Sequence, residues 1–431
     1  MVRLIKGTAV LPGVNGGEKM RKEDDLWITV KPHSLSIMDD GRLVASFDRA
    51  GRLYTVYREG HTFVRGLSGI VVEKWHAEPL APKHIRVLTE DEKRAFLARL
   101  WSEVSDIVTA FRKGRARVQI FTQGSGAEDL DRWLERILAW DASAYARDEE
   151  RFLSVYKPVS ILPPDQYLAL VLQVTEGCHW NKCTFCDFYR DRRFQIKTDE
   201  AVRQHIAAVK AFLGDSITLR RSLFLADANA LILPQERLLR ILELIHESFS
   251  FGNGRTHAEG GVTLEGIYSF LDAYSGMRKT VEDFIALRER HVKRLYLGVE
   301  SGHDELLQFV NKPGTAEEAL DVVTRIKAAG LSVGVIILIG LGGDLFFEAH
   351  VRDTIALLRE MPLGREDIIY LSPLYIHPGS DYEEKARAFR VRALTWEEMK
   401  RQIRLIRDGL RGAPSAERPK ISIYDVREFV Y

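Results

Sequence analysis

The stretch LALVLQVTEGCHWNKCTFCDFY, Leu168 to Tyr189, joins two patterns that together decide the fold. Its first eight residues, Leu168–Thr175, are nearly all apolar, which is typical of a parallel strand buried on both faces. Three cysteines follow the strand, and the chain contains no others: Cys178, Cys183 and Cys186. A buried strand that runs into a cysteine loop predicts an α/β domain with an inorganic centre at the carboxyl end of its sheet.

Strand and helix patterns alternate along the chain after this stretch. Four further apolar runs predict strands, and a weaker strand pattern lies near Gly266–Phe270. The segments between them have helical periodicity, as in TAEEALDVVTRIKAAG, which ends in the capping glycine Gly330. Six strands with intervening helices predict a partial (β/α)6 barrel of the TIM type over residues 165–385. The four runs are Ser222–Asp227, Val292–Glu300, Ser332–Gly340 and Asp367–Ile376.

The residues before this barrel have a different organisation. From about Asp25 to His76, short alternating apolar runs are separated by turn signals, which predicts an antiparallel meander. Helical patterns follow, one of them from about Ala127 to Trp140. The proline-rich string KPVSILPPDQY then marks a domain boundary. We therefore expect an N-terminal α+β accessory domain, residues 1–160, and a short helical extension after the barrel, residues 386–431.

The composition is that of an ordinary globular chain in a reducing compartment. The net charge is +1, from 62 basic and 61 acidic residues, which disfavours nucleic acid as a partner. No apolar segment reaches the roughly 18–20 residues that span a bilayer, and the N-terminus lacks the pattern of a secretory signal. Three clustered thiols make a poor disulfide framework. We therefore expect a cytoplasmic protein whose cysteines bind metal or take part in catalysis.

The spacing C-x4-C-x2-C suits an iron–sulfur cluster. Three thiolates cannot bind every iron of a [4Fe–4S] cube, so one iron is left open to a substrate or cofactor. Structural zinc needs a closed tetrahedron, and His179 offers a fourth ligand, so a zinc-bearing binding protein is one alternative. A cluster-bearing regulator or electron carrier without turnover is another. A carrier usually closes its cluster with a fourth cysteine, which this chain lacks.

The cysteine loop resembles that of the radical S-adenosylmethionine (SAM) superfamily. The usual spacing there is C-x3-C-x2-C with an aromatic residue before the last cysteine; Phe185 takes this place, and one extra residue separates Cys178 from Cys183. The resemblance covers residues 168–385. It implies that Cys178, Cys183 and Cys186 hold a [4Fe–4S] cluster and that SAM binds the open iron. It also implies an enzyme that cleaves SAM reductively to a 5′-deoxyadenosyl radical, which takes hydrogen from a substrate.

The resemblance also implies contacts to SAM at the strand ends. Superfamily members carry a Gly-Gly-Glu-like turn after the second strand that contacts the SAM amino group; this chain has Ala226 and Asp227 there. After the fourth strand, Glu300 and Ser301 would contact the ribose hydroxyls or the methionyl carboxylate. Tyr375 on the sixth strand would lie near the adenine at the mouth of the barrel.

Each of these polar residues also has a simpler interpretation. Asp227 or Asn229 could cap the next helix, and Ser301 could act as an N-cap. Histidines titrate near neutral pH and can serve as acids or bases on the substrate side, or they can lie on the surface. The substrate-side candidates, with His377 and Lys312 chosen as catalytic, are His257, Glu259, His303, Lys312 and His377.

The small number of cysteines also limits the reaction. With all three assigned to one cluster, none remains for an auxiliary cluster or a methylated cysteine, which disfavours methylthiotransferases. No D-x-H-x-x-G signature of cobalamin binding occurs, and Asp187 follows Cys186 where oxygen-independent coproporphyrinogen oxidases have C-x-C. The expected partners are a small-molecule substrate and an electron donor such as flavodoxin or ferredoxin.

Overall fold

A computed structural model of the chain describes residues 26–76, 83–121, 127–252, 262–412 and 417–431. These residues form two compact units. Of the described residues, the first unit comprises those up to Val159 together with Val209–Arg220 and Arg427–Tyr431, and the second comprises Ser160–Ala208 and those between Arg221 and Val426. No helix in the described ranges has both the length and the apolar character needed to cross a membrane.

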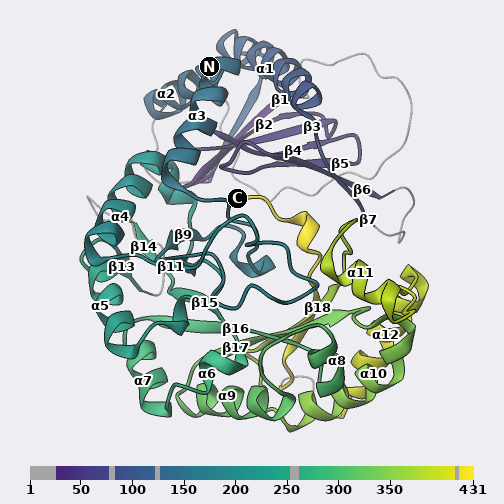
Figure 1. The fold of residues 1–431 in the computed structure, drawn as a ribbon. Helices are drawn as coiled ribbons and strands as arrows, with labels where there is room; N and C mark the ends of the chain where they lie inside the picture. Colours follow the sequence, from purple (N-terminus) through teal and green to yellow (C-terminus); the bar gives the residue numbers. More distant parts are fainter. Residues whose placement is uncertain (1–25, 77–82, 122–126, 253–261, 413–416) are drawn as a thin grey trace. The chain divides into compact units, whose positions relative to one another are not determined.

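The second unit is built on a seven-stranded parallel sheet that curls into a partial barrel of the TIM type (Figure 1). The strand order is β19-β18-β17-β16-β15-β12-β9, so the predicted six strands are confirmed and lie side by side in chain order. The strands are β9 (Leu170–Gln173), β12 (Leu223–Ala226), β15 (Ile267–Leu271), β16 (Val292–Glu300), β17 (Ser332–Ile339), β18 (Ile368–Pro373) and β19 (Lys420–Ile423).

The C-terminal extension differs from the prediction because it is not helical throughout. The amphipathic pattern after the capping box Thr395–Glu398 forms α12, Trp396–Gly409, as expected. The chain then adds β19 as an edge strand parallel to β18, with Ile369 paired to Ile421. The KISI segment of β19 is short and none of its residues is fully buried, so it carries little of the apolar signal that marks a central strand.

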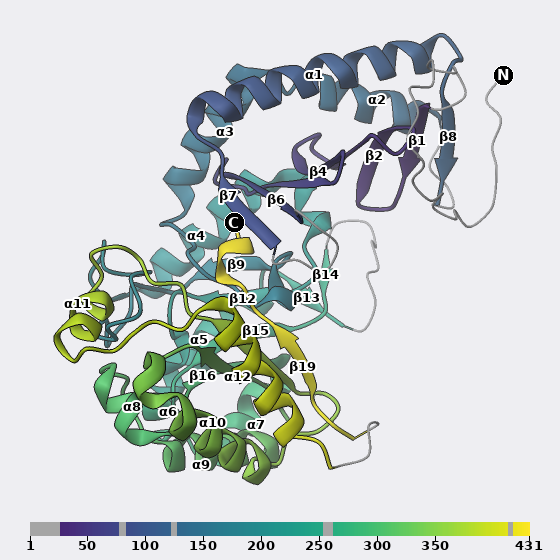
Figure 2. The same ribbon diagram turned by 90° about the vertical axis from the view of Figure 1, so that its right-hand side faces the viewer.

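Helices surround the outside of the barrel strands (Figures 1 and 2). Local signals define their ends: α9 begins with a capping box at Thr315 and is followed by Gly330, whose φ of 76° favours glycine. The longer helices are α4 (Asp199–Leu213), α5 (Gln235–His246), α7 (Val281–Glu289), α9 (Ala316–Ala328) and α10 (Gly343–Glu360). Shorter ones are α6 (Ala273–Gly276), α8 (Asp304–Phe309) and α11 (Asp381–Ala388).

Parallel pairing brings the carboxyl ends of the barrel strands to one edge of the sheet. β9 and β12 are buried at every position, as their apolar sequences predict, and Gln173 pairs with Ala226 at their ends. Toward the other edge, Asp165 accepts hydrogen bonds from the hydroxyls of Tyr296 and Tyr370 at 2.5 and 2.7 Å. These three polar groups are therefore paired with one another away from the carboxyl edge.

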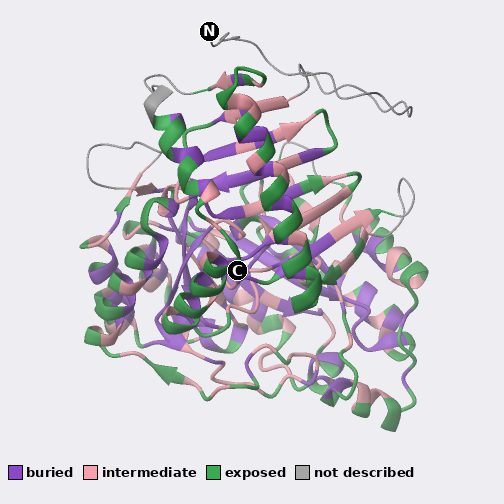
Figure 3. Cartoon of the chain, turned by 90° about the horizontal axis from the view of Figure 1, so that it is seen from above, coloured by how far each residue is buried: buried purple, intermediate pink, exposed green. Residues whose placement is uncertain are grey.

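The first unit contains an eight-stranded sheet in the order β7-β6-β5-β4-β3-β2-β1-β8. The predicted meander is confirmed, and a parallel strand, β8, adds to β1. Buried residues run along these strands (Figure 3) and pack against helices to form one core. The strands are β1 (Leu26–Val30), β2 (Ser34–Asp39), β3 (Leu43–Asp48), β4 (Leu53–Arg58), β5 (His61–Arg65), β6 (Val71–His76), β7 (Lys83–Val87) and β8 (Arg117–Ile120); the helices are α1 (Glu90–Arg112), α2 (Ala127–Leu138) and α3 (Ala142–Val155).

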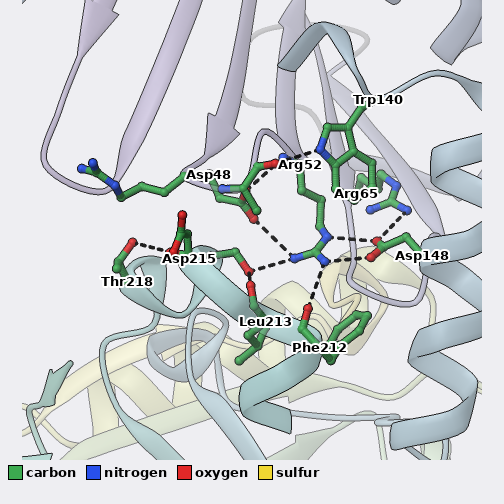
Figure 4. Close-up of polar contacts among 12 residues, drawn as sticks. Asp48, Arg52, Arg65, Trp140, Asp148, Phe212, Leu213, Asp215 and Thr218 are labelled. Atoms are coloured by element: carbon green, nitrogen blue, oxygen red, sulfur yellow. Dashed lines mark hydrogen bonds and ion pairs between the residues drawn. The ribbon is translucent and has the colours of Figure 1, made fainter. Parts of the chain in front are cut away.

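A buried ion pair ties together distant segments of the first unit (Figure 4). The guanidinium of Arg52 donates to both carboxylate oxygens of Asp148 on α3, at 2.9 and 2.7 Å, and to the Ser216 hydroxyl at 2.8 Å. It also lies against the rings of Trp140 and Phe212, at 5.2 and 5.0 Å from their centroids. Loss of one partner of such a pair typically costs about 3–5 kcal/mol, so this network fixes Val209–Arg220 within the first unit.

Candidate functional site

A cavity of about 210 Å³ lies at the carboxyl edge of the barrel sheet. Its wall combines the ends of β15, β16 and β18 with the loop that follows β9. Aromatic and aliphatic side chains predominate, with a few charged groups among them. Such an apolar cavity with few polar groups at strand ends is the usual form of a ligand site in α/β proteins.

A second cavity, of about 370 Å³, lies in the first unit beside α1. Its lining consists largely of arginines and carboxylates that neutralise one another, as when Arg99 donates to Glu103 at 3.0 Å. The larger cavity has no cysteine in its lining, whereas the wall of the smaller cavity contains all three cysteines of the chain.

Cys178, Cys183 and Cys186 converge on the barrel cavity, as the sequence predicts for ligands of one centre. Burial raises the pKa of the Cys183 thiol to about 11 and that of Cys186 to about 12. A metal must therefore displace protons from these thiols when it binds. Within the described ranges, no three His, Cys, Asp or Glu side chains surround the position of a single ion. A [4Fe–4S] cube is wider than one ion, so three thiols lining a cavity fit a cluster.

Backbone contacts hold the cysteine loop against α8 and α11. The amide of Thr184 donates to the carbonyl of Val310 at 3.0 Å, and the amide of Tyr382 donates to the carbonyl of Thr184 at 3.1 Å. Arg190 donates to the carbonyls of Cys183 and Cys186 at 3.1 and 3.3 Å. The C-x2-C turn is therefore clamped from outside, and its thiols are left for the cavity.

Asp227 is buried at the end of β12, and its carboxylate faces the cysteine loop. It accepts hydrogen bonds from the Gly177 amide and the Gln173 side chain, both at 2.9 Å, and pairs with Arg192 at 3.3 Å. Burial raises the pKa of this carboxyl, although the donors of Gly177 and Gln173 oppose the rise. Asn229, rather than Asp227, caps the next turn by accepting from the amide of Leu231 at 3.1 Å.

Glu300 and Lys312 form a buried ion pair on the cavity wall. Their charged atoms are 2.9 Å apart, and their side chains are 10% and 12% exposed. A bulge in the pairing of β16 with β17 lies between Gly298 and Glu300, and Glu300 ends the strand with a φ of 63°. Burial alone would lower the pKa of Lys312, but Glu300 and Cys183 outweigh it and raise that pKa above its ordinary value. A Cβ at Gly298 would lie 2.6 Å from a Glu300 oxygen, so the glycine leaves space for this carboxylate.

Two predicted site residues lie away from the cavity wall. The Ser301 hydroxyl contacts the ring of His350 at 2.8 Å and accepts from the amide of His303 at 3.0 Å. The N-cap of α8 is His303, so the alternative that Ser301 acts as an N-cap is wrong. The ring of His303 pairs with Asp353 at 2.7 Å. The structure thus uses Ser301 and His303 to support the turn after Glu300.

The remaining predicted residues divide between the wall and the sheet. Phe185, Tyr375 and His377 line the cavity, and the rings of Tyr375 and His377 meet edge to face at 4.9 Å. Ala226 is buried, and its carbonyl accepts from the amide of Val174 at 2.9 Å as part of the sheet. The candidates His257 and Glu259 lie outside the described residues.

Several wall residues were not predicted from the sequence. Asp272 follows β15, caps α6 by accepting from the Ser275 amide at 2.7 Å, and also accepts from Asn229 at 2.5 Å. Its position directly after a strand could have marked Asp272 as a wall residue, but the sequence pattern of β15 is weak. Tyr424 and Val426 reach the cavity only because β19 joins the sheet, which local sequence does not reveal.

Comparison with known proteins gives one family and several distant relatives. The Radical SAM superfamily matches residues 172–358. A tRNA-2-methylthio-N(6)-dimethylallyladenosine synthase of Vibrio cholerae is 24% identical over 163 residues, 34% of this chain and 34% of that protein. The chain thus matches about a third of the length of this curated relative.

Solved structures with a similar fold include radical SAM enzymes. Coproporphyrinogen III oxidase of Escherichia coli has a TM-score of 0.42 and 14% identity, over 63% of this chain and 57% of that chain. Methylornithine synthase has a TM-score of 0.37 and 15% identity, over 66% and 70%. The superfamily uses a [4Fe–4S] cluster and SAM, and the predicted cysteine triad lies within the matched range. Residues 172–358 are therefore similar to the Radical SAM superfamily, whose members are enzymes.

Proposed function

We propose that this chain is a radical SAM enzyme, which binds its cluster through Cys178, Cys183 and Cys186 and its SAM beside Glu300 and Lys312. One observation carries the proposal: the three thiols and the buried ion pair line the same cavity at the carboxyl edge of the barrel. A thiol triad supplies three ligands and leaves one iron for the cofactor. When bound and reduced, the cluster and SAM together supply a radical that can take a hydrogen atom from an unreactive carbon.

The charged pair would orient the cofactor rather than react. Glu300 can accept hydrogen bonds from two neighbouring hydroxyls, as a ribose presents, while Lys312 donates to a carboxylate. Their mutual bond gives each group a partner inside an apolar wall until the cofactor arrives. Tyr375 and His377 would form the edge of the adenine site, and His377 remains our candidate acid or base toward the substrate.

We infer a small-molecule substrate from the size and lining of the cavity. Its volume is about 210 Å³, and Phe270, Tyr424 and Ile161 contribute apolar surface beyond the charged pair. The Vibrio relative acts in tRNA modification by its name, but this chain has a net charge of +1 and no cysteines beyond the triad. We therefore propose radical chemistry on a small molecule, in the cytoplasm, with flavodoxin or ferredoxin as electron donor.

Replacement of Glu300 by alanine tests the assignment of the SAM site. The variant should take up the cluster like the wild type, because Glu300 touches none of the loop anchors described above, and it should bind SAM more weakly. Loss of hydrogen bonds to a charged group, each worth about 1.5–3 kcal/mol, predicts a loss of affinity of roughly 10- to 100-fold. Equilibrium binding of SAM to the anaerobically reconstituted protein measures it. An unchanged affinity would remove Glu300 from the SAM site.

The zinc-bearing alternative has less support from the geometry. The His179 ring points to Asp272, with Nε2 3.7 Å from the carboxylate, and burial lowers the pKa of that histidine. Metal and sulfide analysis of anaerobically purified protein separates the two functions. About four irons with matching sulfide supports the cluster, whereas one zinc without sulfide, lost on replacement of His179 by alanine, supports the alternative.

A further inference from the structure

Both ends of the cysteine loop meet on one buried carboxylate. Gly177, directly before Cys178, donates its amide to Oδ2 of Asp227 at 2.9 Å. Arg192, six residues after Cys186, donates Nη1 to the same oxygen at 3.3 Å. The side chains of Arg192 and Asp227 are 8% and 2% exposed, so water screens this pair little.

The same residue also joins the loop to the sheet. The other carboxylate oxygen of Asp227 accepts from Gln173, the last residue of β9, at 2.9 Å. Its backbone amide donates to the Thr175 hydroxyl at 3.1 Å. Asp227 therefore fixes both ends of the loop relative to the strand that leads into it.

The backbone at the start of the loop is shaped for this contact. Gly177 has a φ of 73°, and a Cβ there would lie 3.1 Å from the carbonyl oxygen of Arg193. A side chain at this position would be both strained and crowded. The amide of Gly177 can thus approach the carboxylate while the next residue, Cys178, faces the cavity.

All hydrogen-bonding partners described for the Asp227 carboxylate belong to the loop or to β9. Asp227 is 3% exposed and is absent from the described wall of the cavity, which places its carboxylate with the loop and not with a ligand of the cavity. A carboxylate in this position can act on the cluster through its ligand loop. This role rests on the proposed cluster site, because it concerns how that site is held.

We propose that Asp227 is a positioning residue that anchors both ends of the cysteine loop, in place of contacting the SAM amino group. Closing the loop at one point removes conformational freedom before the metal binds. The three thiols are then presented together, and Arg192 joins the far end of the loop to the anchoring carboxylate.

Replacement of Asp227 by asparagine tests this role, because the amide keeps the size of the side chain and removes the ion pair with Arg192. Outer partners of metal ligands typically contribute roughly 10- to 100-fold to metal affinity. We expect iron to be lost to a chelator at least about tenfold faster, while SAM affinity per loaded cluster stays within about twofold of the wild type.

A second readout uses the metal-free protein. Amide hydrogen exchange over residues 178–191 should become faster in the asparagine variant, because the loop ends are no longer joined. Replacement of Arg192 by glutamine should give the same pattern in milder form, and replacement by lysine should restore part of it. These variants keep the test decisive where the asparagine variant fails to fold.

Asp367 provides a matched control in the same unit. It is fully buried, accepts from the amides of Val333 and Gly364, both at 2.7 Å, and pairs with Lys327 at 2.7 Å. Its replacement by asparagine should lower the melting temperature without changing iron release or exchange in the loop.

The outcomes separate this inference from the proposed function. Wild-type protein that takes up no iron overturns the cluster itself. Wild-type protein that holds a cluster, with an Asp227→Asn variant that keeps the same iron release and loop exchange, overturns the anchor alone. A variant that retains its cluster normally but loses SAM affinity tenfold would return Asp227 to the SAM site.

Discussion

Strand β12 ends next to Asp227 and strand β16 ends in Glu300, so two carboxylates stand at the same edge of one parallel sheet. Both are buried, and each is paired with a cation. The partner of Asp227 comes from the cysteine loop, whereas the partner of Glu300, Lys312, lines the cavity beside it. The two residues thus have the same functional group and the same place at the end of a parallel strand, but they contact different parts of the protein. The neighbouring segment that supplies the cation determines which way each carboxylate points.

The two ends also differ in how the backbone turns. At β16 a bulge and the left-handed φ of Glu300 rotate the carboxylate toward the cavity. At β12 the side chain points back to β9, and the left-handed residue is Gly177 in the loop itself. In our proposal, the left-handed residue at the first end serves the SAM site, and the one at the second end serves the protein's own loop. We therefore predict that substitutions at the end of β12 mainly reduce retention of the cluster, and that substitutions at the end of β16 mainly reduce SAM affinity.

Replacement of Cys183 by alanine should have the largest effect and sets the scale for the comparison. Loss of one of three thiolate ligands leaves two, so we expect no stable cluster after anaerobic reconstitution. Iron and sulfide content, together with the brown absorbance of the protein, measure the loss. The result defines the limit that variants of the Asp227 anchor should approach but not reach. A full iron content in this variant would contradict the ligand assignment.

Replacement of Lys312 by methionine should damage the β16 end alone. Glu300 would remain buried without its partner, which typically costs about 3–5 kcal/mol in the free energy of unfolding. Denaturant unfolding of the metal-free protein measures this loss. A double variant with Glu300→Gln serves as the control and should recover much of the stability, because no unpaired charge then remains. Equal instability of the double variant would show that packing, and not charge, holds this end.

Acidification should also weaken the β16 end, through His350. This histidine is fully buried, and burial together with His303 lowers its pKa to about 4, although Asp353 opposes the shift. The unfolded chain binds the proton near pH 6.5, so folding stability falls as the pH drops below that value. We expect a loss of about 2 kcal/mol between pH 7 and pH 5 from this group.

An asparagine at position 350 isolates the contribution of this histidine. It cannot take up the proton, and it can still contact the Ser301 hydroxyl that His350 now holds at 2.8 Å. The difference between wild type and variant in the free energy of unfolding, measured at pH 7 and pH 5, should therefore shrink on acidification. A constant difference at both pH values would show that His350 titrates normally.

The smallest effects should come from two glycine substitutions, which compare the two ends directly. Alanine at Gly177 would adopt a left-handed conformation at a cost of roughly 1–2 kcal/mol and should speed iron loss. Alanine at Gly298 would place a Cβ 2.6 Å from a Glu300 oxygen and should weaken SAM binding several-fold with normal iron retention. Iron release should thus change in the Gly177 variant but not in the Gly298 variant, and SAM affinity should fall mainly in the Gly298 variant. The same change in both variants would mean that the two ends act as one site.

Much of the architecture was predictable from local patterns. The buried strand before Cys178, the alternation that follows it and the meander of the first unit depend on periodicity and turn residues, which neighbours in sequence determine. The edge strands β8 and β19 were missed because they are short and form only where a sheet edge already exists. The cysteine triad was predictable for a similar reason, since its members are close in sequence and share one chemistry.

The sequence by itself determined which residue types stand at the ends of the strands, including both carboxylates, the triad and the lysine after β16. Only the tertiary structure decided that Glu300 pairs with Lys312 on the wall of a cavity, that Ser301 contacts a histidine, and that Asp227 accepts from the Gly177 amide. The physical reason is that a side chain's role depends on where its charge finds a partner. Those partners lie 12 residues away for Glu300 and 50 residues away for the Gly177 amide, so only the folded chain brings them within bonding distance.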